Sequence, residues 1–569
     1  MPHISALNKK LDKAFSGRVR AELRDGCLYL TGGLNDWDDI VRAGLMSVSK
    51  KKYTVVNDIV FSGGTIPSAR LPSVTDTALE GSRPDVLIIG GGVVGCAIAR
   101  ELTRYKLDVM LAEKEHDVAL HASSRNDGMV HPGADLHKGQ LKKKYNDAGN
   151  RMYPAVCKEL DVPFRYTGQY LCFTDAWLKP VVIVSLLYWK YMGIPAAYIG
   201  RKKLFEKEPH LSDKVQFALF FPMAGVVCPY GLTIAYAENA ADNGAKICMD
   251  TAVTGIEVSD GMIASVQTNR GSIYPKLVIN AVGVFAEEIA RLARDRFFSI
   301  HPRRGTNMIF DKKAAFRVRT IASPFDISER KTSAKKEHSK GGGIIRTVDD
   351  NLLVGPNAIE TYEKENFSTQ RESIETVLAK QRKTAPDLSE RDLITYFTGI
   401  RAATYEEDFI VSFGKYTKNI IHAAGIQSPG LTAAPAIAVD ISKMAAEYLG
   451  AAANENFNPQ RTAIVRAAAL PDEERDALIK KDADYGVIVC RCEEVSRGEV
   501  FAALRRSVPC DTVDGVKRRV RPGMGRCQGS FCGPHIAELI AAEKKIPVCE
   551  VKKMSDNSRI LLGDTKEDV

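Results

Sequence analysis

The 569-residue chain lacks any apolar run near the roughly 18 residues that a membrane-spanning helix needs. Its strongest candidate is "VVIVSLLYW" at 181–189, which predicts a buried helix segment rather than a span. The first residues, "MPHISALNKKLDKAF", lack the apolar stretch of a secretory signal. We therefore expect a protein of the cytoplasm without a transmembrane segment.

Cysteines spaced as in a disulfide framework are also missing. Twelve cysteines are scattered over the chain, and without a secretory signal they do not indicate disulfides. The net charge of +9 is modest for this length, and no recognition-helix pattern or interleaved aromatic residues accompany the basic run "VKRRVRPGMGR" at 516–526. We therefore expect no nucleic-acid partner, and no internal repeat is visible.

A chain of this length is too long for a single hydrophobic core of ordinary size. We therefore expect about three to four domains. Residues 1–80 alternate apolar and polar positions through "RAELRDGCLYLTG", predict a small αβ module and resemble BON domains in this pattern. Residues 450–483 predict a helical or extended connector, and residues 484–569 predict a small cysteine-containing module of helical type.

Residues 84–449 alternate strand runs such as "DVLIIG" and "LVINAVG" with helical stretches. This alternation is typical of an α/β architecture and predicts a Rossmann-like domain. Interleaved runs such as "RYTGQYLCFT" and "GGIIRTVDDNLLVGP" predict a second, antiparallel sheet that forms a substrate domain.

A dinucleotide site is predicted where Gly90, Gly92 and Gly95 follow the strand "DVLIIG" and open a helix. Gly90 permits the tight turn, Gly92 lets the backbone approach a pyrophosphate, and Gly95 lets the helix pack closely on the strand. The phosphates then lie at the helix N-terminus. Glu113 ends the next strand, where its carboxylate can accept hydrogen bonds from ribose hydroxyls.

More distant segments show a family resemblance. They include "ASSRNDGMVHPG" (122–133), "FTGIRAATYEEDFIV" (397–411) and "NIIHAAGIQSPGLTAAPAIA" (419–438). The chain resembles here the FAD-dependent family of glycerol-3-phosphate dehydrogenases, L-2-hydroxyglutarate dehydrogenases and D-amino-acid oxidases. The resemblance implies FAD and a set of residues around it. Beyond the three glycines and Glu113, these are Lys114, Ser123, Ser124, Arg125, Asn126, Val253, Gly283, Gly425, Gln427, Gly430, Leu431 and Thr432.

Arg401 in "TGIRAAT" matches the family position where an arginine grips the carboxylate or phosphate of the substrate. A planar, permanently charged guanidinium suits that task because it can make two parallel hydrogen bonds to the anion. The alternative is an ion pair with the acidic residues that follow, which are Glu406, Glu407 and Asp408.

His131 matches a family histidine near the flavin and is a candidate catalytic base, because histidine titrates near neutral pH. A structural histidine held in its loop is the alternative. Arg304 and Arg346 are weaker candidates for binding an anion. Where many relatives have Asn-Ser-Gly, this chain has Asn126-Asp127-Gly128, and a charge at Asp127 would disfavour an anionic substrate if it pointed into the pocket.

Four cysteines near the end of the chain have the spacing of metal ligands. Cys490 and Cys492 form a C-x-C pair, and Cys527 and Cys532 follow in "GRCQGSFCG". Zinc and reduced free thiols are the alternatives, although a C-x-C pair is unusual for structural zinc. The segment resembles the bacterioferritin-associated-ferredoxin-like module of anaerobic-type glycerol-3-phosphate dehydrogenase subunits, and the resemblance implies a 2Fe-2S cluster.

The basic run next to these cysteines has two expected roles. Its charges can offset the negative charge of a four-thiolate cluster. They are also expected to form an exposed face, Arg518 to Arg526, on which a partner docks. The residues concerned are Lys517, Arg518, Arg519, Arg521 and Arg526.

Together these features imply a dehydrogenase with FAD and a 2Fe-2S cluster that oxidises a small hydroxylated substrate like glycerol 3-phosphate. The resemblance also implies that the electron acceptor is a second flavoprotein subunit, and it leaves the oligomeric state open. Two alternatives remain at this point. One is a 2-hydroxy-acid or amino-acid dehydrogenase, and the other is an electron-transfer subunit without a small substrate of its own.

Overall fold

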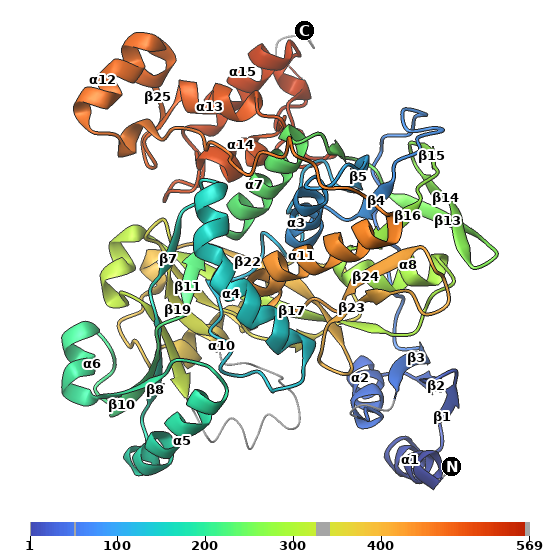
Figure 1. Cartoon of the computed structure of the whole chain (residues 1–569). Coiled ribbons are helices and arrows are strands. Elements are labelled where there is room, and N and C mark those ends of the chain that lie inside the picture. The colour runs from blue at the N-terminus through green and yellow to red at the C-terminus, as the bar shows by residue number, and fades with distance from the viewer. Residues whose placement is uncertain (1, 50–52, 326–341, 564–569) are drawn as a thin grey trace.

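The computed structural model describes residues 2–49, 53–325 and 342–563. The N-terminal module, in blue, and the C-terminal cysteine module, in orange to red, lie at opposite ends of a central body of sheets and helices (Figure 1). Within the described ranges no helix is both long enough and apolar enough to cross a membrane.

The N-terminal module is a three-stranded sheet with two helices packed on it. Strands β1 and β2 are antiparallel, and β3 pairs in parallel with β2. Asp25 and Gly26 both have positive φ (47° and 71°), as a tight two-residue hairpin turn requires. The resemblance to BON domains stays a prediction. The elements are α1 (Pro2–Phe15), β1 (Val19–Arg24), β2 (Cys27–Leu34), α2 (Trp37–Met46) and β3 (Thr54–Phe61).

The central sheet has six strands in the order β12-β5-β4-β16-β24-β23, and all neighbours are parallel except β23. Strands β4, β5, β16 and β24 are buried along their whole length, because both faces of a parallel sheet are covered. This confirms the predicted α/β architecture. The strands are β4 (Val86–Ile89), β5 (Val109–Ala112), β12 (Lys246–Cys248), β16 (Leu277–Asn280), β23 (Ile410–Phe413) and β24 (Ile420–Ala424).

One face of this sheet is covered by helices and the other by a small sheet. Ile88 and Leu111 pack among helices α3, α4, α7 and α11, whereas Leu87 and Met110 pack against β13–β15 and α8. The covering elements are α3 (Val93–Leu102), α4 (Leu141–Glu159), α7 (Pro229–Asp242), α11 (Gly430–Leu449), α8 (Ala286–Leu292), β13 (Val253–Ser259), β14 (Met262–Thr268) and β15 (Gly271–Ile273).

The predicted second sheet has nine strands in the order β21-β17-β20-β19-β18-β8-β10-β9, and β22 also pairs with β17. It is mixed rather than purely antiparallel, because β18 runs parallel to β8. The strands are β8 (Gln169–Phe173), β9 (Ala197–Gly200), β10 (Phe217–Phe221), β17 (Ile300–Phe310), β18 (Ile321–Phe325), β19 (Gly343–Arg346), β20 (Leu352–Gly355), β21 (Ile359–Glu360) and β22 (Leu393–Thr404).

A separate three-stranded sheet and two helices accompany this domain. The sheet has the order β6-β11-β7, and helix α10 packs against the nine-stranded sheet through Val377 and Leu378. The elements are β6 (Met129–Val130), β7 (Phe164–Tyr166), β11 (Gly225–Val227), α6 (Arg201–Lys207) and α10 (Arg371–Gln381).

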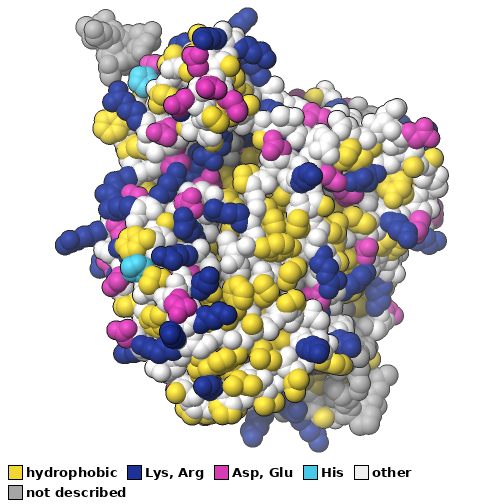
Figure 2. Space-filling model, turned by 60° about the vertical axis from the view of Figure 1, so that its left-hand side comes forward, with side chains coloured by type: hydrophobic (Ala, Val, Ile, Leu, Met, Phe, Trp, Pro, Cys, Tyr) yellow, Lys and Arg dark blue, Asp and Glu magenta, His cyan; other side chains and the backbone are white. Residues whose placement is uncertain are grey.

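The apolar segment 181–189 forms a helix, α5 (Lys179–Tyr191), but it is not buried as the sequence predicts. Within α5 only Val182 is buried, and most of the other apolar side chains face solvent. Figure 2 turns this side of the molecule toward the viewer, and its lower part shows hydrophobic side chains bordered by Lys and Arg.

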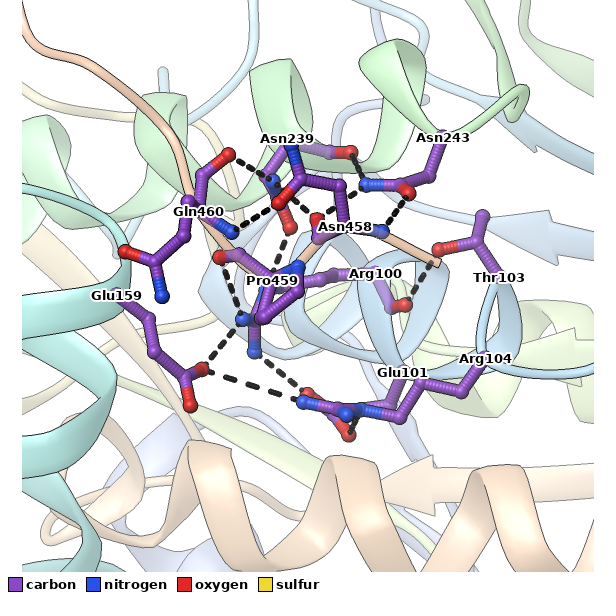
Figure 3. A network of polar contacts seen from close by, with 10 residues as sticks. All are labelled: Arg100, Glu101, Thr103, Arg104, Glu159, Asn239, Asn243, Asn458, Pro459 and Gln460. Carbon is purple, nitrogen blue, oxygen red and sulfur yellow. Dashed lines mark hydrogen bonds and ion pairs between the residues drawn. The ribbon is translucent and has the colours of Figure 1, made fainter. Parts of the chain in front are cut away.

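The connector at 450–483 is held to the central body by a buried arginine (Figure 3). Arg100, on α3, is 1% exposed and forms ion pairs with Glu101 at 2.8 Å and Glu159 at 2.6 Å. The same guanidinium donates to the Asn239 side chain at 2.8 Å and to the carbonyl oxygen of Pro459 at 3.1 Å. One charge therefore ties α3, α4, α7 and the connector together.

Replacing Arg100 with methionine is expected to lower the free energy of unfolding by about 3–5 kcal/mol, because two acidic side chains lose their buried partner. Residues 450–460 should also become more sensitive to proteases. Arg104→Met is the matched control, since Arg104 is 39% exposed and its ion pair with Glu101 is worth at most about 1 kcal/mol. Equal melting temperatures of the two variants would contradict this role for Arg100.

The C-terminal module contains a two-stranded sheet and three helices around a small core of its own. Helix α13 begins with a capping box in which Ser496 and Glu499 bond each other's backbone N–H groups. The elements of the connector and module are α12 (Asp472–Lys481), β25 (Ile488–Cys490), β26 (Val495–Ser496), α13 (Arg497–Leu504), α14 (Val513–Val520) and α15 (Gly533–Lys544).

Candidate functional site

A cavity of about 1440 Å³ runs from the carboxyl ends of the central strands to the nine-stranded sheet. Typical small-molecule sites are about 300–1,000 Å³, so this cavity has room for a dinucleotide and a small substrate together. Most of the residues predicted for the site lie in its wall. They are Gly90, Gly92, Glu113, Lys114, Ser123, Arg125, Asn126, His131, Val253, Gly283, Arg401, Gln427, Gly430 and Leu431.

The glycine turn has the geometry expected for pyrophosphate. Gly90 has a φ of +109°, and a Cβ there would lie 2.6 Å from the carbonyl oxygen of Ala281. A Cβ at Gly95 would lie 1.9 Å from the carbonyl oxygen of Gly90, so the helix can pack this closely only with glycine. Gly92 is the residue before α3 and has no side chain that could cap the helix, and the N-terminus of α3 lines the cavity.

Glu113 lies at the end of β5 with its carboxylate against this turn. It accepts hydrogen bonds from the backbone N–H of Gly91 at 2.6 Å and of Glu115 at 2.9 Å. Burial raises the pKa of Glu113. Lys114 also reaches the cavity, and it forms ion pairs with Glu115 and with Glu365. Glu113 thus lines the cavity beside the glycine turn, and its role toward a ribose stays a prediction, whereas Lys114 is paired with carboxylates.

Residues 123–126 form a loop over the helix N-terminus. Ser123 Oγ accepts a hydrogen bond from the backbone N–H of Val93 at 2.9 Å. Within the same loop, the side-chain amide of Asn126 donates to the carbonyl oxygen of Ala122 at 3.0 Å. The guanidinium of Arg125 lies over the ring of Phe367, and burial lowers its pKa to about 10. Ser124 belongs to this loop but does not line the cavity.

The segment before α11 forms the opposite wall. Gln427 donates to Glu407 Oε2 at 2.7 Å, and Gly430 and Leu431 begin the helix at the cavity. Gly425 (φ +65°) and Thr432 lie behind this wall. The hydroxyl oxygen of Thr432 accepts a hydrogen bond from the backbone N–H of His131 at 2.8 Å. This bond joins the loop of His131 to the first turn of α11.

Arg401 lies on β22, directly opposite Arg303 on β17. Its guanidinium covers Gly305, where a Cβ would come within 2.7 Å of Nη2, and Nη1 donates to the carbonyl oxygen of Asn357 at 3.2 Å. Burial lowers its pKa to about 10, with a smaller contribution from the positive charge of Arg303. It remains a cation at neutral pH, and within the described ranges it forms no ion pair.

The three acidic residues after Arg401 have other partners. Glu407 pairs with Arg303 at 2.8 Å, and Glu406 accepts the backbone N–H of Val55 at 2.6 Å. Asp408 accepts the backbone N–H groups of residues 141 and 142. The alternative that Arg401 pairs with one of these acids is therefore wrong.

His131 and Asp127 both lie in the cavity wall. The carbonyl oxygen of His131 accepts from Asn150 at 2.9 Å, so its backbone is fixed on both sides. Asp127 accepts the backbone N–H of Met129 at 3.2 Å, and its charge lies near enough to Arg401 to favour the charged guanidinium. The negative charge of Asp127 is thus partly compensated within the site.

The two weaker arginine candidates lie outside the cavity. Arg304 donates to the backbone carbonyl of Ser368, and Arg346 pairs with Asp350 at 2.9 Å. Neither side chain contributes to the cavity wall.

Asn307 is a site residue that the sequence did not single out. It lies on β17 in the cavity wall and is 1% exposed, and neither of its amide atoms has a hydrogen-bond partner within the described ranges. Strand alternation places Arg303, Gly305 and Asn307 on one face, so the period-two pattern of "RRGTNM" could have identified it. A buried amide without partners is poised to bind a polar ligand.

The four predicted cysteines come together in the C-terminal module. Cys492 and Cys527 have their sulfur atoms 3.8 Å apart, and the Cys532 thiol lies against Cys490. The hydrogen bond from the Cys532 thiol lowers the pKa of Cys490 to about 5. The backbone N–H of Gly523 makes a smaller contribution in the same direction. The backbone N–H of Gly529 lowers the pKa of Cys527.

These sulfur atoms form two pairs rather than one compact group. Within the described ranges no three of them lie within 4.8 Å of one another. A tetrahedral zinc with Zn–S bonds of about 2.3 Å would bring all four within about 4 Å. Two pairs instead suit two irons with two thiolates each. A Cβ at Gly525 would lie 2.4 Å from Cys492 Cβ, so glycine is required for this close approach.

The basic run does not form an exposed docking face, which contradicts the expectation from the sequence. Arg519 is 1% exposed in its side chain and pairs with Asp117 at 2.8 Å, and Arg518 reaches the same carboxylate at 3.3 Å. Arg521 pairs with Asp349 at 2.7 Å. These charges attach the cysteine module to the central body. Only Arg526 is largely exposed, and it pairs with Asp311 at 2.9 Å.

Comparison with protein families gives two matches. Residues 85–444 match the family described as FAD dependent oxidoreductase, and residues 488–542 match the BFD-like 2Fe-2S binding domain. The glycerol 3-phosphate dehydrogenase of Caloramator mitchellensis is 38% identical over 492 residues, which cover 85% of this chain and 99% of that protein. One subunit of the anaerobic glycerol-3-phosphate dehydrogenase of Escherichia coli is 23% identical over 496 residues, 80% and 88% of the two chains.

A solved structure shares the fold of the central body. The dithionite-reduced L-alpha-glycerophosphate oxidase of Mycoplasma pneumoniae with FAD bound has a TM-score of 0.62 and 26% sequence identity. The match covers 67% of this chain and 98% of that chain. The first family match spans the glycine turn and the cavity, and the second spans the two cysteine pairs.

Proposed function

The chain belongs to the FAD-dependent oxidoreductase family and carries a BFD-like 2Fe-2S domain, and on this premise we propose that it oxidises glycerol 3-phosphate or a close polyol phosphate. The observation that carries the proposal is Arg401, a half-buried cation in the cavity wall without an ion-pair partner in the described ranges. A buried charge is costly unless it is paired, so the site is complete only with an anionic ligand.

In the proposed reaction a secondary alcohol loses two electrons and two protons and becomes a ketone. Bound FAD supplies the two-electron acceptor chemistry. The glycine turn, the N-terminus of α3 and Glu113 fit its pyrophosphate and ribose, because all of them line one end of the cavity.

The residues of the nine-stranded sheet fix the substrate. Arg401 binds its phosphate through two guanidinium nitrogens. Asn307 lies two positions along β17 from Gly305, which Arg401 covers, so its amide can bond a hydroxyl about 6–7 Å from the guanidinium. We assign the hydroxyl proton to His131, which lines the cavity and whose backbone N–H bonds Thr432 in the first turn of α11.

We also propose that electrons leave through the cysteine module to a partner protein. Tyr230, in the first turn of α7, donates to Met524 Sδ at 3.4 Å, and Met524 lies three residues before Cys527. The neighbouring Pro229 packs near Gly128 in the cavity loop. The loop that holds two of the cysteines thus touches the segment behind the cavity wall. Phe531 in the same loop is 81% exposed, and we propose that the partner contacts the module on this side.

The substrate class is tested by initial rates with an artificial electron acceptor. Glycerol 3-phosphate is expected to give the largest kcat/KM. Glycerol lacks the anion and a simple 2-hydroxy acid lacks the further hydroxyl, so both should be poorer by about a hundredfold or more, as for other sites that lose a charged or hydrogen-bonding contact. Equal kcat/KM for glycerol and glycerol 3-phosphate would contradict the role of Arg401.

Replacing Asn307 with leucine is expected to lower kcat/KM for glycerol 3-phosphate by about 5- to 150-fold, because one or two hydrogen bonds to a desolvated hydroxyl are lost. The rate with a 2-hydroxy acid that has no further hydroxyl should change little. The ratio of the two rates in the same preparation is the measurement, since it cancels losses of folded enzyme. A parallel fall for both substrates would mean that Asn307 only supports the fold.

A further inference from the structure

Helix α5 presents an apolar surface to solvent. The exposed side chains follow the helical repeat at positions i, i+4, i+7, i+11 and i+14 from residue 177, with Leu187 beside them. A solvent-facing helix surface is normally polar, whereas here no acidic residue lies on α5 at all. The surface, which we call the α5 face, consists of Trp177, in the turn before the helix, and Val181, Val184, Leu187, Tyr188 and Tyr191 on the helix.

Basic residues border the α5 face. Residues 174–207 contain six Lys or Arg and only two acidic residues. Lys179 and Lys190 lie at the two ends of the helix, and Lys138 places its ammonium 4.6 Å from the ring centre of Tyr191. In Figure 2 hydrophobic side chains at the lower part of this side of the molecule are accompanied by Lys and Arg.

We propose that the α5 face docks on the surface of a bilayer that contains anionic lipids. The helix has 13 residues and is about 20 Å long, too short to span a bilayer, so it would lie flat with its apolar side among the acyl chains. Trp177 at one end and Tyr188 and Tyr191 at the other are the residue types that favour the boundary between lipid and water. The lysines then meet the lipid phosphates.

A second copy of the chain fits this face less well. A two-fold contact would place the α5 face of one copy on that of the other, and the basic borders would then oppose each other without acidic partners. A lipid surface supplies both the apolar layer and the negative charge.

Docking through α5 would also determine where the cavity lies relative to the membrane. Val182 and Trp189 of the same helix line the cavity, and so do Val181 and Tyr188 at the edge of the α5 face. Docking would therefore hold the substrate end of the cavity against the membrane surface, although the bound enzyme would have no spanning segment in the described ranges.

The proposal is tested by flotation of the intact holoenzyme with vesicles. Binding is expected with mixed phosphatidylcholine and phosphatidylglycerol, and weaker binding with phosphatidylcholine alone. Val184→Glu and Leu187→Glu should each reduce binding to the mixed vesicles by about tenfold or more, because a carboxylate replaces an apolar side chain in the interface. Neither residue lines the cavity, so activity with a soluble acceptor should be retained.

Val60→Glu is the matched control, since Val60 and Val184 are both 65% exposed and Val60 lies on the N-terminal module. Brominated lipids should also quench the fluorescence of Trp177, and Trp177→Phe should remove most of that quenching. The proposal fails if the wild-type protein does not float with mixed vesicles, or if Val60→Glu reduces binding as much as Val184→Glu. It also fails if Val184→Glu converts a dimer to a monomer without affecting vesicle binding.

Discussion

Replacing Arg401 with alanine is expected to lower kcat/KM for glycerol 3-phosphate by about a hundred- to a thousandfold while bound FAD is retained. The guanidinium is the only cation that covers Gly305 on the substrate sheet within the described ranges, and its nearest protein acceptor is the carbonyl oxygen of Asn357. Loss of one partner of a buried, charged contact costs about 2–5 kcal/mol. Most of this loss of binding free energy should appear as a lower kcat/KM for the anionic substrate.

Two further variants sharpen this test. Arg401→Lys should recover part of the activity, because lysine keeps the charge but cannot make two parallel hydrogen bonds. Arg304→Ala is the matched control, since Arg304 lies next to Arg303 on β17 but bonds Ser368 outside the cavity. Loss of FAD from Arg401→Ala, measured from the absorbance of the purified protein, would show that Arg401 supports the cofactor instead.

Replacing Cys527 with serine should remove iron and acid-labile sulfide from the protein and slow turnover with the native partner by about tenfold or more, because loss of a ligand weakens metal binding at least this strongly. The content of FAD and the first anaerobic reaction with substrate should stay near wild-type values. The cysteine module contributes no residue to the cavity wall in the described ranges, so the two effects should separate.

Cys549→Ser is the control for this prediction, because Cys549 is partly exposed in the same module and is not one of the four paired cysteines. It should retain iron and turnover. Stoichiometric zinc without sulfide in the wild-type protein would contradict the cluster. Unchanged turnover of Cys527→Ser with the native partner would show that electrons leave the cavity without passing the cysteines.

The cofactor end of the site could be predicted from the sequence because its determinants are local. Gly90, Gly92 and Gly95 act within one strand–turn–helix unit, and the spacing alone indicates their contacts. The C-x-C and C-x-x-x-x-C spacings predicted the four cysteines as a group, although the contacts Cys492–Cys527 and Cys490–Cys532 join the two motifs. The glycines are close in the chain, whereas the cysteines were predicted from a spacing that recurs in one kind of module.

The features that the sequence did not predict depend on contacts between segments that are far apart in the chain. Nothing near Asp117 in the sequence shows that it pairs with Arg519, about 400 positions away, so the basic run was predicted to face solvent. Asn307 became a candidate only when its amide was found without partners in the cavity wall. The segment 181–189 has the composition of a core helix, and only its place at the edge of the nine-stranded sheet shows that it is exposed.

The central claim, that this chain oxidises a polyol phosphate with its own FAD, is tested most directly by anaerobic addition of glycerol 3-phosphate to the purified holoenzyme. We expect rapid loss of the visible absorbance of the flavin with this compound. Glycerol and lactate at the same concentration should cause little or no loss, because Arg401 and Asn307 select for the phosphate and the further hydroxyl. Absorbance that is unchanged by glycerol 3-phosphate, or lost equally fast with glycerol, would contradict the claim.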